Sequence, residues 1–305
     1  MASQNGAINL ANSSDAATLR STFVAILASG KTAGLVGQRQ ISILQTGLEK
    51  LDISSLNTLK GLLGQAGSQT QQFFILKAYA AGESWANLQD FASQIRSVPD
   101  ATIAARCTMR GAQDITQQWQ DTCGPTVIET AAGELDPRFA WELHKLGDVT
   151  RVDPTGAEAD VAAQQKQWLE TYGGRAVQRG QTGGTGIALD QILNDMIGPM
   201  LGCKFQAMQV SSPAQGISAI EGALGAGFDV PLRISWSQPG SGTDEGHFVL
   251  AMNVRSGASG RELQIHDPWT GRTDWIAESS IANNSFAPIF NEYGRLSHVY
   301  VPVTA

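Results

Sequence analysis

The sequence predicts an α+β protein in which helices come first and the strands of an antiparallel sheet come last. Up to residue 224, apolar residues recur three and four positions apart, as on one face of a helix. From residue 230 onward they form short runs or alternate with polar residues, as in strands. Because helices and strands are segregated along the chain, the α+β class is favoured over a wound parallel sheet.

The first part, residues 1–100, is predicted to be a helical region of unknown role. Residues ~14–98 read as a small bundle, with caps at Ser14 or Asp15, at Ser54 or Ser55 and at Ser84. The apolar faces are Leu19, Phe23, Ile26 and Leu27; Ile41, Leu44, Leu48 and Leu51; Leu56, Leu59, Leu62 and Leu63; and Trp85, Leu88, Phe91 and Ile95. No acid pair or metal-ligand spacing occurs here, which favours docking, regulation or substrate recruitment.

The second part, residues 101–305, is predicted to be the catalytic domain. Its expected helices are one that starts at Cys123 and those at 160–172, 189–197 and 214–224. Its expected strands are 230–236, 247–254, 263–267, 273–276 and 298–303. Ser212 to Gln215 form a capping box at the start of the last helix.

Cys123 is expected at the N-terminus of a helix. Asp121 and Thr122 are suitable caps, and Pro125 is tolerated in the first turn. Unpaired N–H groups and the helix dipole stabilise an anion there, which favours a reactive thiolate. Cys123 is therefore the candidate nucleophile, and its own backbone N–H is a candidate donor to an oxyanion.

His247 and Asp267 are the candidate base and the group that orients it. His247 starts an apolar run, and Asp267 ends the next alternating run, just before Pro268. The Gly- and Ser-containing segment 255–262 has the composition of a hairpin connection. Two adjacent antiparallel strands would bring the Asp267 carboxylate to the His247 ring.

These residues, in this order, resemble the papain-like cysteine peptidases, most closely the bacterial C39-like peptidases. The resemblance is carried by Gln117, by Cys123-Gly124-Pro125, by Gly246 to Val249 and by Asp267-Pro268-Trp269, and it covers about the last two-thirds of the chain. It implies a nucleophile helix packed on an antiparallel sheet. It also implies a triad of Cys123, His247 and Asp267. The six-residue spacing of the family selects Gln117 over Gln118 and Gln120 as the second oxyanion donor.

Three functions are open for such a site. The first is a cysteine peptidase, a hydrolase that cleaves peptide bonds in a protein or peptide substrate, in the setting of a bacterial effector. The second is a glutamine deamidase or transglutaminase-like effector or toxin that uses the same residues. The third is a non-catalytic binding module, which would be expected to lack the nucleophile or the base, whereas this chain has both.

The composition excludes several other classes. The net charge is −7, the pI is near 5.1 and no cluster of Lys and Arg occurs, so no nucleic acid or membrane partner is expected. The first residues lack the features of a signal peptide, which predicts a protein that is cytoplasmic as synthesised, with export without a cleavable signal left open. Three widely spaced cysteines predict neither a disulfide framework nor a zinc site, and no cofactor is expected.

The remaining candidates have simpler interpretations. Cys107 and Cys203 are expected to be buried apolar residues. His144, His266 and His298 are expected to be structural, and the glycine-rich segment 180–186 to be a mobile loop rather than a phosphate site. Trp119 and Trp269 are expected either to line a subsite or to pack in the core.

Overall fold

The structure, a computed structural model, describes residues 7–10, 15–109, 115–146, 159–179, 187–236, 246–257, 260–287, 289 and 294–303. The chain divides into two compact units. Unit 1 comprises residues 1–109 and 133–142, and unit 2 comprises residues 110–132 and 143–305. Each unit is described separately below.

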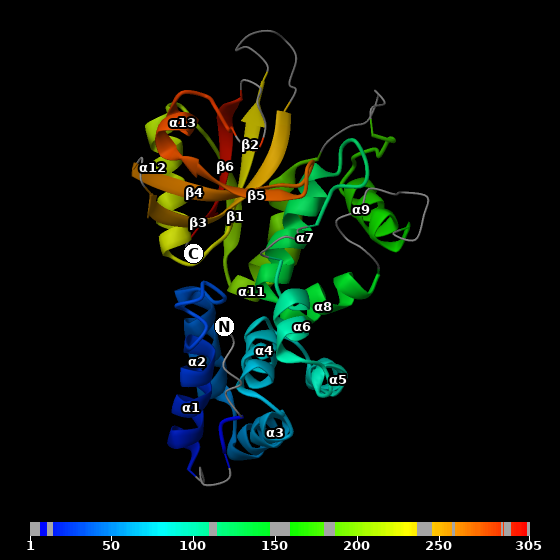
Figure 1. Ribbon diagram of the computed structural model, residues 1–305, viewed down its shortest axis with the longest axis vertical. Helices are drawn as coiled ribbons and strands as arrows, with labels where there is room; N and C mark the ends of the chain where they lie inside the picture. Colours follow the sequence, from blue (N-terminus) through cyan, green and yellow to red (C-terminus); the bar gives the residue numbers. More distant parts are fainter. Residues whose placement is uncertain are drawn as a thin grey trace. The chain divides into compact units, whose positions relative to one another are not determined.

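Unit 1 is helical in its described residues. Its helices are α1 (Ala16–Ala28), α2 (Gln38–Lys50), α3 (Ile53–Gly64), α4 (Gln69–Ala80), α5 (Trp85–Ile95) and α6 (Asp100–Arg106) (Figure 1). The predicted apolar faces of α1, α2, α3 and α5 are buried in one core. Asp15 and Ser84 cap α1 and α5 as expected, whereas Asp52 caps α3 in place of Ser54 or Ser55.

Two helices of unit 1 have no counterpart among the predicted elements. α4 packs against α1, α2, α3, α5 and α6, and its residues are buried on almost every side. A helix that is buried all round has no apolar stripe, so periodicity does not reveal it. α6 lies beyond the predicted bundle of residues ~14–98, and Pro99 is its cap residue.

Helices α7 (Cys123–Leu135) and α8 (Pro137–Lys145) each contain residues of both units. Their shared segment, residues 133–142, is held within unit 1 by side chains of earlier helices. Gln40 donates to the carbonyl of Leu135 at 3.0 Å, and the Trp141 indole donates to Gln94 at 2.8 Å. Unit 1 therefore extends beyond the predicted boundary at residue 100 and takes in a later part of the chain.

Unit 2 contains a six-stranded sheet in the order β1-β6-β2-β3-β4-β5. The strands are β1 (Lys204–Gln209), β2 (Val230–Ser235), β3 (Gly246–Gly257), β4 (Gly260–Asp267), β5 (Arg272–Ala277) and β6 (Arg295–Val303). Every neighbouring pair is antiparallel. Together with the helices, this sheet confirms the predicted α+β class.

The five predicted strands are present, and the hairpin of β3 and β4 is as expected. Leu250 pairs with His266, so the end of β4 lies beside the start of β3. β1 was not predicted because its burial pattern is irregular and only Phe205 in it is buried. As β1 precedes a helix, strands and helices are segregated less strictly than the sequence pattern indicated.

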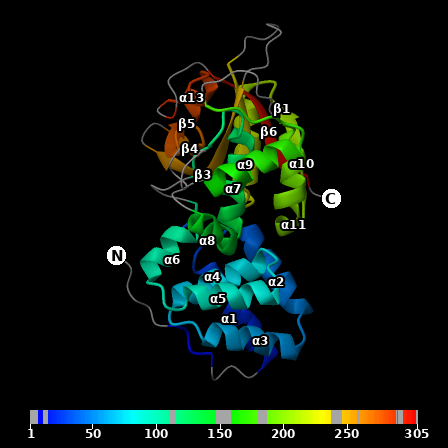
Figure 2. The ribbon, with the colours of Figure 1, turned by 90° about the vertical axis from the view of Figure 1, so that its right-hand side faces the viewer.

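Helices lie on both faces of the sheet. α12 (Pro213–Gly225) packs on β6, β3 and β2, and α13 (Glu278–Ala282) packs on β4 and β5. Figure 1 shows α12 on one side of the sheet, with α7 and α9 (Ala159–Thr171) on the other. Figure 2 shows α7 and α9 side by side. The remaining helical segments are α10 (Leu189–Ile192), the π-helical turn Leu193–Ile197 and α11 (Gly198–Leu201).

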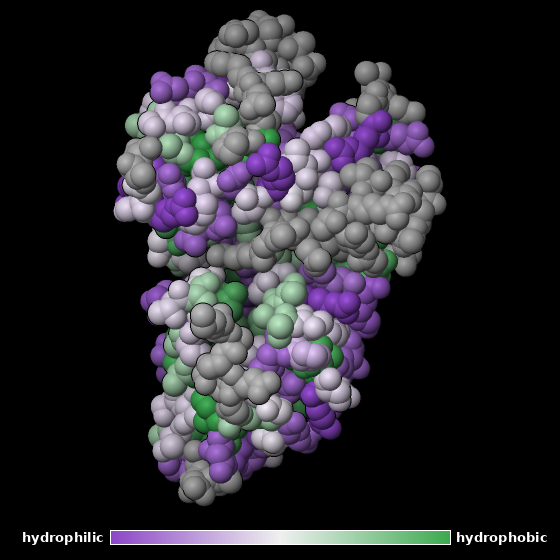
Figure 3. Space-filling view, in the orientation of Figure 1, coloured by the Kyte–Doolittle hydropathy of each residue, from purple (hydrophilic) through white to green (hydrophobic). Residues whose placement is uncertain are grey.

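The described surface carries few large apolar side chains. Within the described ranges, Ile53 is the one large hydrophobic residue that is exposed, with 51% of its surface accessible. On the face that Figure 3 shows, apolar residues are scattered among polar ones. Of the helices that the structure describes, none is long and apolar enough to cross a bilayer.

Candidate active site

Cys123 is the first residue of α7, as the sequence predicts. The Thr122 carbonyl accepts the backbone N–H of Thr126 at 2.9 Å, so the helical hydrogen bonds begin at that turn. The Cys123 N–H therefore belongs to the first turn, where N–H groups have no acceptor within the helix. Cys123 is partly exposed. A Cβ atom at Gly124 would lie 3.1 Å from the end of the Leu189 side chain, so a larger residue here would require Leu189 to shift.

His247 and Asp267 meet as the predicted hairpin requires. His247 Nε2 donates to Asp267 Oδ1 at 2.6 Å, and both side chains are buried. The Cys123 thiol lies close enough to the His247 ring to raise its pKa. Because Nε2 is used by Asp267, Nδ1 is the ring nitrogen that is left for Cys123. The three sequence-predicted residues thus lie together in unit 2, and His247 interacts with both Cys123 and Asp267.

The surroundings of His247 favour its charged form. Burial lowers the pKa of His247, but the hydrogen bonds to Asp267 and Cys123, with the negative charges of these two groups, raise it to about 9. Burial raises the pKa of Asp267, but the hydrogen bond and the charge of His247, with donors in the following turn, lower it overall. An imidazolium held between a carboxylate and a thiol is the arrangement that stabilises a thiolate.

The Asp267 carboxylate is fixed by the turn that follows it. The Trp269 N–H donates to Oδ1 at 2.9 Å, and the Thr270 hydroxyl donates to Oδ2 at 2.7 Å. The Gly271 N–H bonds the Asp267 carbonyl at 2.9 Å. This turn orients both carboxylate oxygens of Asp267.

Gln117 lies in the segment before Cys123, fully buried, but its side chain is already engaged. Its amide nitrogen donates to the carbonyls of Trp119 at 2.8 Å and Gln120 at 2.9 Å. These bonds use both N–H hydrogens, and the buried Oε1 atom has no hydrogen-bond partner. In this conformation Gln117 braces the loop and has no hydrogen left for an oxyanion.

Gln165 of α9 supports the same loop, and the sequence analysis did not single it out. Its Oε1 accepts the backbone N–H of Gln118 at 2.7 Å and lies 3.2 Å from the Thr122 hydroxyl. Its Nε2 donates to the Thr116 carbonyl at 3.3 Å and to Glu129 at 3.0 Å. Gln165 is fully buried, so these bonds are made away from water. Nothing in the local pattern of α9 distinguishes this glutamine from its polar neighbours.

Arg179 and Trp236 also contact the site and were not predicted. The Arg179 guanidinium donates to the carbonyls of Gln117 at 3.2 Å and Trp269 at 2.9 Å. It also stacks on the Trp269 ring at 3.7 Å from the ring centre. The Trp236 ring stacks on His247, with ring centres 6.1 Å apart.

The other sequence candidates lie elsewhere or serve the fold. His266 is buried and bonds the Thr273 hydroxyl, in agreement with its structural interpretation. Trp119 donates its indole N–H to the Ala162 carbonyl at 2.8 Å. Cys107 is buried as predicted, whereas Cys203 is partly exposed, which corrects the expectation for that residue. The glycine-rich segment 180–186 lies outside the described residues.

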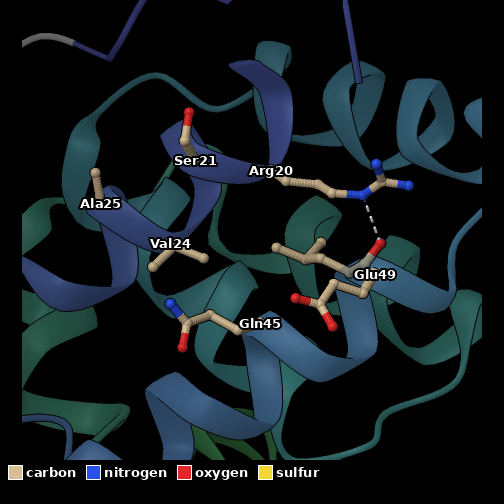
Figure 4. A pocket seen from close by; sticks show the side chains of 7 residues that line it. Arg20, Ser21, Val24, Ala25, Gln45 and Glu49 are labelled. Carbon is tan, nitrogen blue, oxygen red and sulfur yellow. Dashed lines mark hydrogen bonds between the residues drawn. The ribbon is translucent and has the colours of Figure 1, made fainter. Parts of the chain in front are cut away.

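Unit 1 contains a separate hollow of about 350 Å³ between α1 and α2. Arg20 crosses one end of it and donates to the carbonyls of Leu48 and Leu51, each at 2.9 Å. Figure 4 shows the rest of the lining, which includes the charged Glu49, the polar Ser21 and Gln45, and the apolar Val24 and Ala25. This hollow contains none of the candidate catalytic residues.

In the parts of the chain that the structure describes, no three His, Cys, Asp or Glu side chains come together as a metal site would require. Comparison of the chain with protein-family models, with curated protein sequences and with solved structures finds no match.

Proposed function

We propose that this protein is a cysteine peptidase with a papain-like catalytic domain. The observation that carries the proposal is the His247–Asp267 hydrogen bond beside Cys123, with the cysteine at a helix N-terminus. The layering of unit 2, in which α7 lies on one face of an antiparallel sheet whose strands carry His247 and Asp267, supports the fold assignment.

The proposed reaction follows from the roles of these groups. The Cys123 thiolate attacks the carbonyl carbon of the scissile bond, and the Cys123 backbone N–H donates to the oxyanion that forms. The His247 imidazolium then gives its proton to the leaving amine. Water, deprotonated by His247, hydrolyses the acyl-enzyme, and the thiolate is restored. Asp267 holds the ring in one orientation throughout.

Gln117 is proposed as a second oxyanion donor only after a rearrangement. One of its two N–H hydrogens must leave the Trp119 or the Gln120 carbonyl before it can bond a substrate oxygen. The first turn of α7 needs no such change. The backbone N–H of Cys123 is therefore the principal donor in this proposal.

The test is a comparison of proteomes incubated with the wild-type protein and with Cys123→Ala. New peptide N-termini that appear with the wild type alone support the peptidase. Glutamine-to-glutamate conversion without new termini would show a deamidase that uses the same site. No change of either kind across susceptible proteomes would contradict both reactions and favour a binding module.

Two controls sharpen this test. Cys203→Ala removes the other partly exposed thiol and should leave the cleavage pattern unchanged. Cleavage should persist in EDTA and be lost after alkylation of Cys123, because a thiolate paired with an imidazolium acts without a metal. Activity that is lost in EDTA and restored by zinc would overturn the mechanism.

A further inference from the structure

The segment that ends at Arg179 connects two parts of the Cys123 site that are far apart in sequence. The backbone N–H of Gln120 donates to the Val177 carbonyl at 2.9 Å, which fixes this segment against the loop before Cys123. Two residues later, the Arg179 guanidinium reaches both that loop, at the Gln117 carbonyl, and the turn after Asp267, at the Trp269 carbonyl.

The bonds of Arg179 have the geometry that only an arginine provides. One planar group donates to two carbonyls from two different segments and lies at the same time against the Trp269 ring. A lysine offers a single ammonium on a flexible stem, so it cannot both bridge the two carbonyls and stack in this way. A backbone bond from the Gln117 N–H to the Pro268 carbonyl, at 2.7 Å, joins the same two segments beside the guanidinium.

The Arg179 charge also acts on the site. Burial lowers the pKa of Arg179, and the charge of the nearby Asp267 raises it. Among the described residues, the charged or titratable groups that the structure records acting on His247 are Cys123 from α7 and Asp267 from β4.

We propose that Arg179 is a positioning residue of the Cys123 site: it holds the loop that leads to Cys123 against the turn that orients Asp267. The proposal rests on the proposed function, because it assigns to Arg179 a role in keeping the nucleophile Cys123 and the base His247 correctly placed relative to each other. Arg179 contacts neither the thiol nor the imidazole, so it is not a catalytic residue.

The test compares Arg179→Lys and Arg179→Met with Arg255→Met. Arg255 is a matched control, since it also stacks on a tryptophan, Trp275, at 4.1 Å and pairs with Glu262 at 2.7 Å. We expect kcat to fall roughly 10- to 100-fold in both Arg179 variants, with KM changed less than about twofold, because a displaced reacting group slows the chemical step. Arg255→Met should retain the wild-type kcat.

A second readout does not depend on turnover. In Arg179→Lys the positive charge remains, so any change in the His247 titration measured by NMR reports geometry. We expect the titration midpoint to move below that of the wild type, because a displaced Asp267 no longer supports the imidazolium as strongly. If the wild type cleaves nothing, the proposed function fails, and this titration still decides the role of Arg179.

Several outcomes would overturn the proposal. A wild-type kcat and a wild-type His247 titration in Arg179→Lys would show that the bridge is unimportant. An equal loss of kcat in Arg255→Met would show a general effect of removing a stacked arginine. If Arg179→Met does not fold, Arg179→Lys decides between the outcomes.

Discussion

The surroundings of His247 shift its pKa in opposite directions. Burial lowers its pKa, while the hydrogen bonds to Asp267 and Cys123 and the charges of both raise it to about 9. The imidazole is therefore mostly charged at neutral pH. As the pH rises through about 9, the imidazolium loses its proton, and with it the stabilisation that it gives to the Asp267 carboxylate.

We expect Cys123→Ala and Asp267→Asn each to lower the pKa of His247. Each substitution removes a hydrogen bond and a negative charge that favour the imidazolium. NMR titration of the histidine rings, with His247→Gln to assign the signal, measures the change. An unchanged His247 midpoint in Cys123→Ala would show that the thiol and the ring do not interact.

The three thiols should differ in reactivity because their exposure and their neighbouring groups differ. Burial raises the pKa of Cys107, and Cys107 has no exposed surface. Cys203 and Cys123 are both partly exposed, and Cys123 lies at a helix N-terminus and interacts with His247. Limiting iodoacetamide at about pH 6.5 should therefore label Cys123 first. Peptide mapping that finds Cys203 or Cys107 labelled faster would remove Cys123 from the role of nucleophile.

At the scale of elements, the loop before α7 is held by buried polar groups rather than by apolar packing. Gln117 bonds two carbonyls of this loop from within, and Gln165 bonds its backbone from α9. Buried hydrogen bonds of this kind fix one backbone conformation, because an unpaired carbonyl or N–H group in the interior is costly.

Gln117→Ala should lower both stability and turnover. The substitution removes the donor to the Trp119 and Gln120 carbonyls, and this loss is expected to lower the unfolding free energy by about 1–3 kcal/mol. If Gln117 also rearranges to bond the oxyanion, kcat should fall on the order of 100- to 1000-fold. Urea unfolding and steady-state kinetics separate the two effects. A large loss of kcat at unchanged stability would mean that the amide is not committed to the loop as it is here.

Glu129 of α7 should make the stability of the protein depend on pH. Burial raises its pKa to about 8 from an ordinary 4.5, against the effect of the Gln165 hydrogen bond. The folded state then keeps a proton that the unfolded state loses, so stability falls as the pH rises between these values. Glu129→Gln should be more stable than the wild type at about pH 8 and similar to it at about pH 4. Equal urea midpoints at the higher pH would show that Glu129 ionises normally.

At the scale of the whole molecule, the two units are interleaved in sequence. Residues 133–142 belong to unit 1, although they follow Cys123, which belongs to unit 2. Within unit 1, Arg138 pairs with Glu83 at 3.1 Å, and Trp141 bonds Gln94. A chain that starts at residue 101 would retain Cys123, His247 and Asp267 but would lack these partners.

The fragment of residues 101–305 should consequently be less stable than the full chain. The side chains of Leu135 and Trp141 are almost fully buried, and their exposure is expected to cost at least about 2 kcal/mol. Urea unfolding of the fragment and of the full chain measures the difference. A fragment as stable as the full chain would support the sequence-based boundary near residue 100 and would mean that segment 133–142 needs no partner in unit 1.

Local patterns were sufficient to predict much of the molecule. The strand that carries His247 is a run of apolar residues, and the strand that ends at Asp267 alternates apolar and polar residues. The short segment between them predicts a hairpin, and a hairpin places the two residues side by side. The start of α7 at Cys123 followed from cap residues and a proline. Three elements were not predicted because their apolar residues show no clear periodicity. They are α4, a helix that is buried on almost every side, β1, a strand of mixed burial, and α13, a helix of five residues.

The sequence by itself determined the α+β class, the position of Cys123 at a helix start and the pairing of His247 with Asp267. These depend on spacing along one strand, helix or hairpin, and such spacing is visible in the chain. Only the tertiary structure decided that the Gln117 amide donates to carbonyls of its own loop. The same holds for the support that Gln165 and Arg179 give to the site and for the place of residues 133–142 in unit 1. Those contacts join segments that are distant in sequence or fix which partner a side chain chooses, and no local pattern encodes that choice.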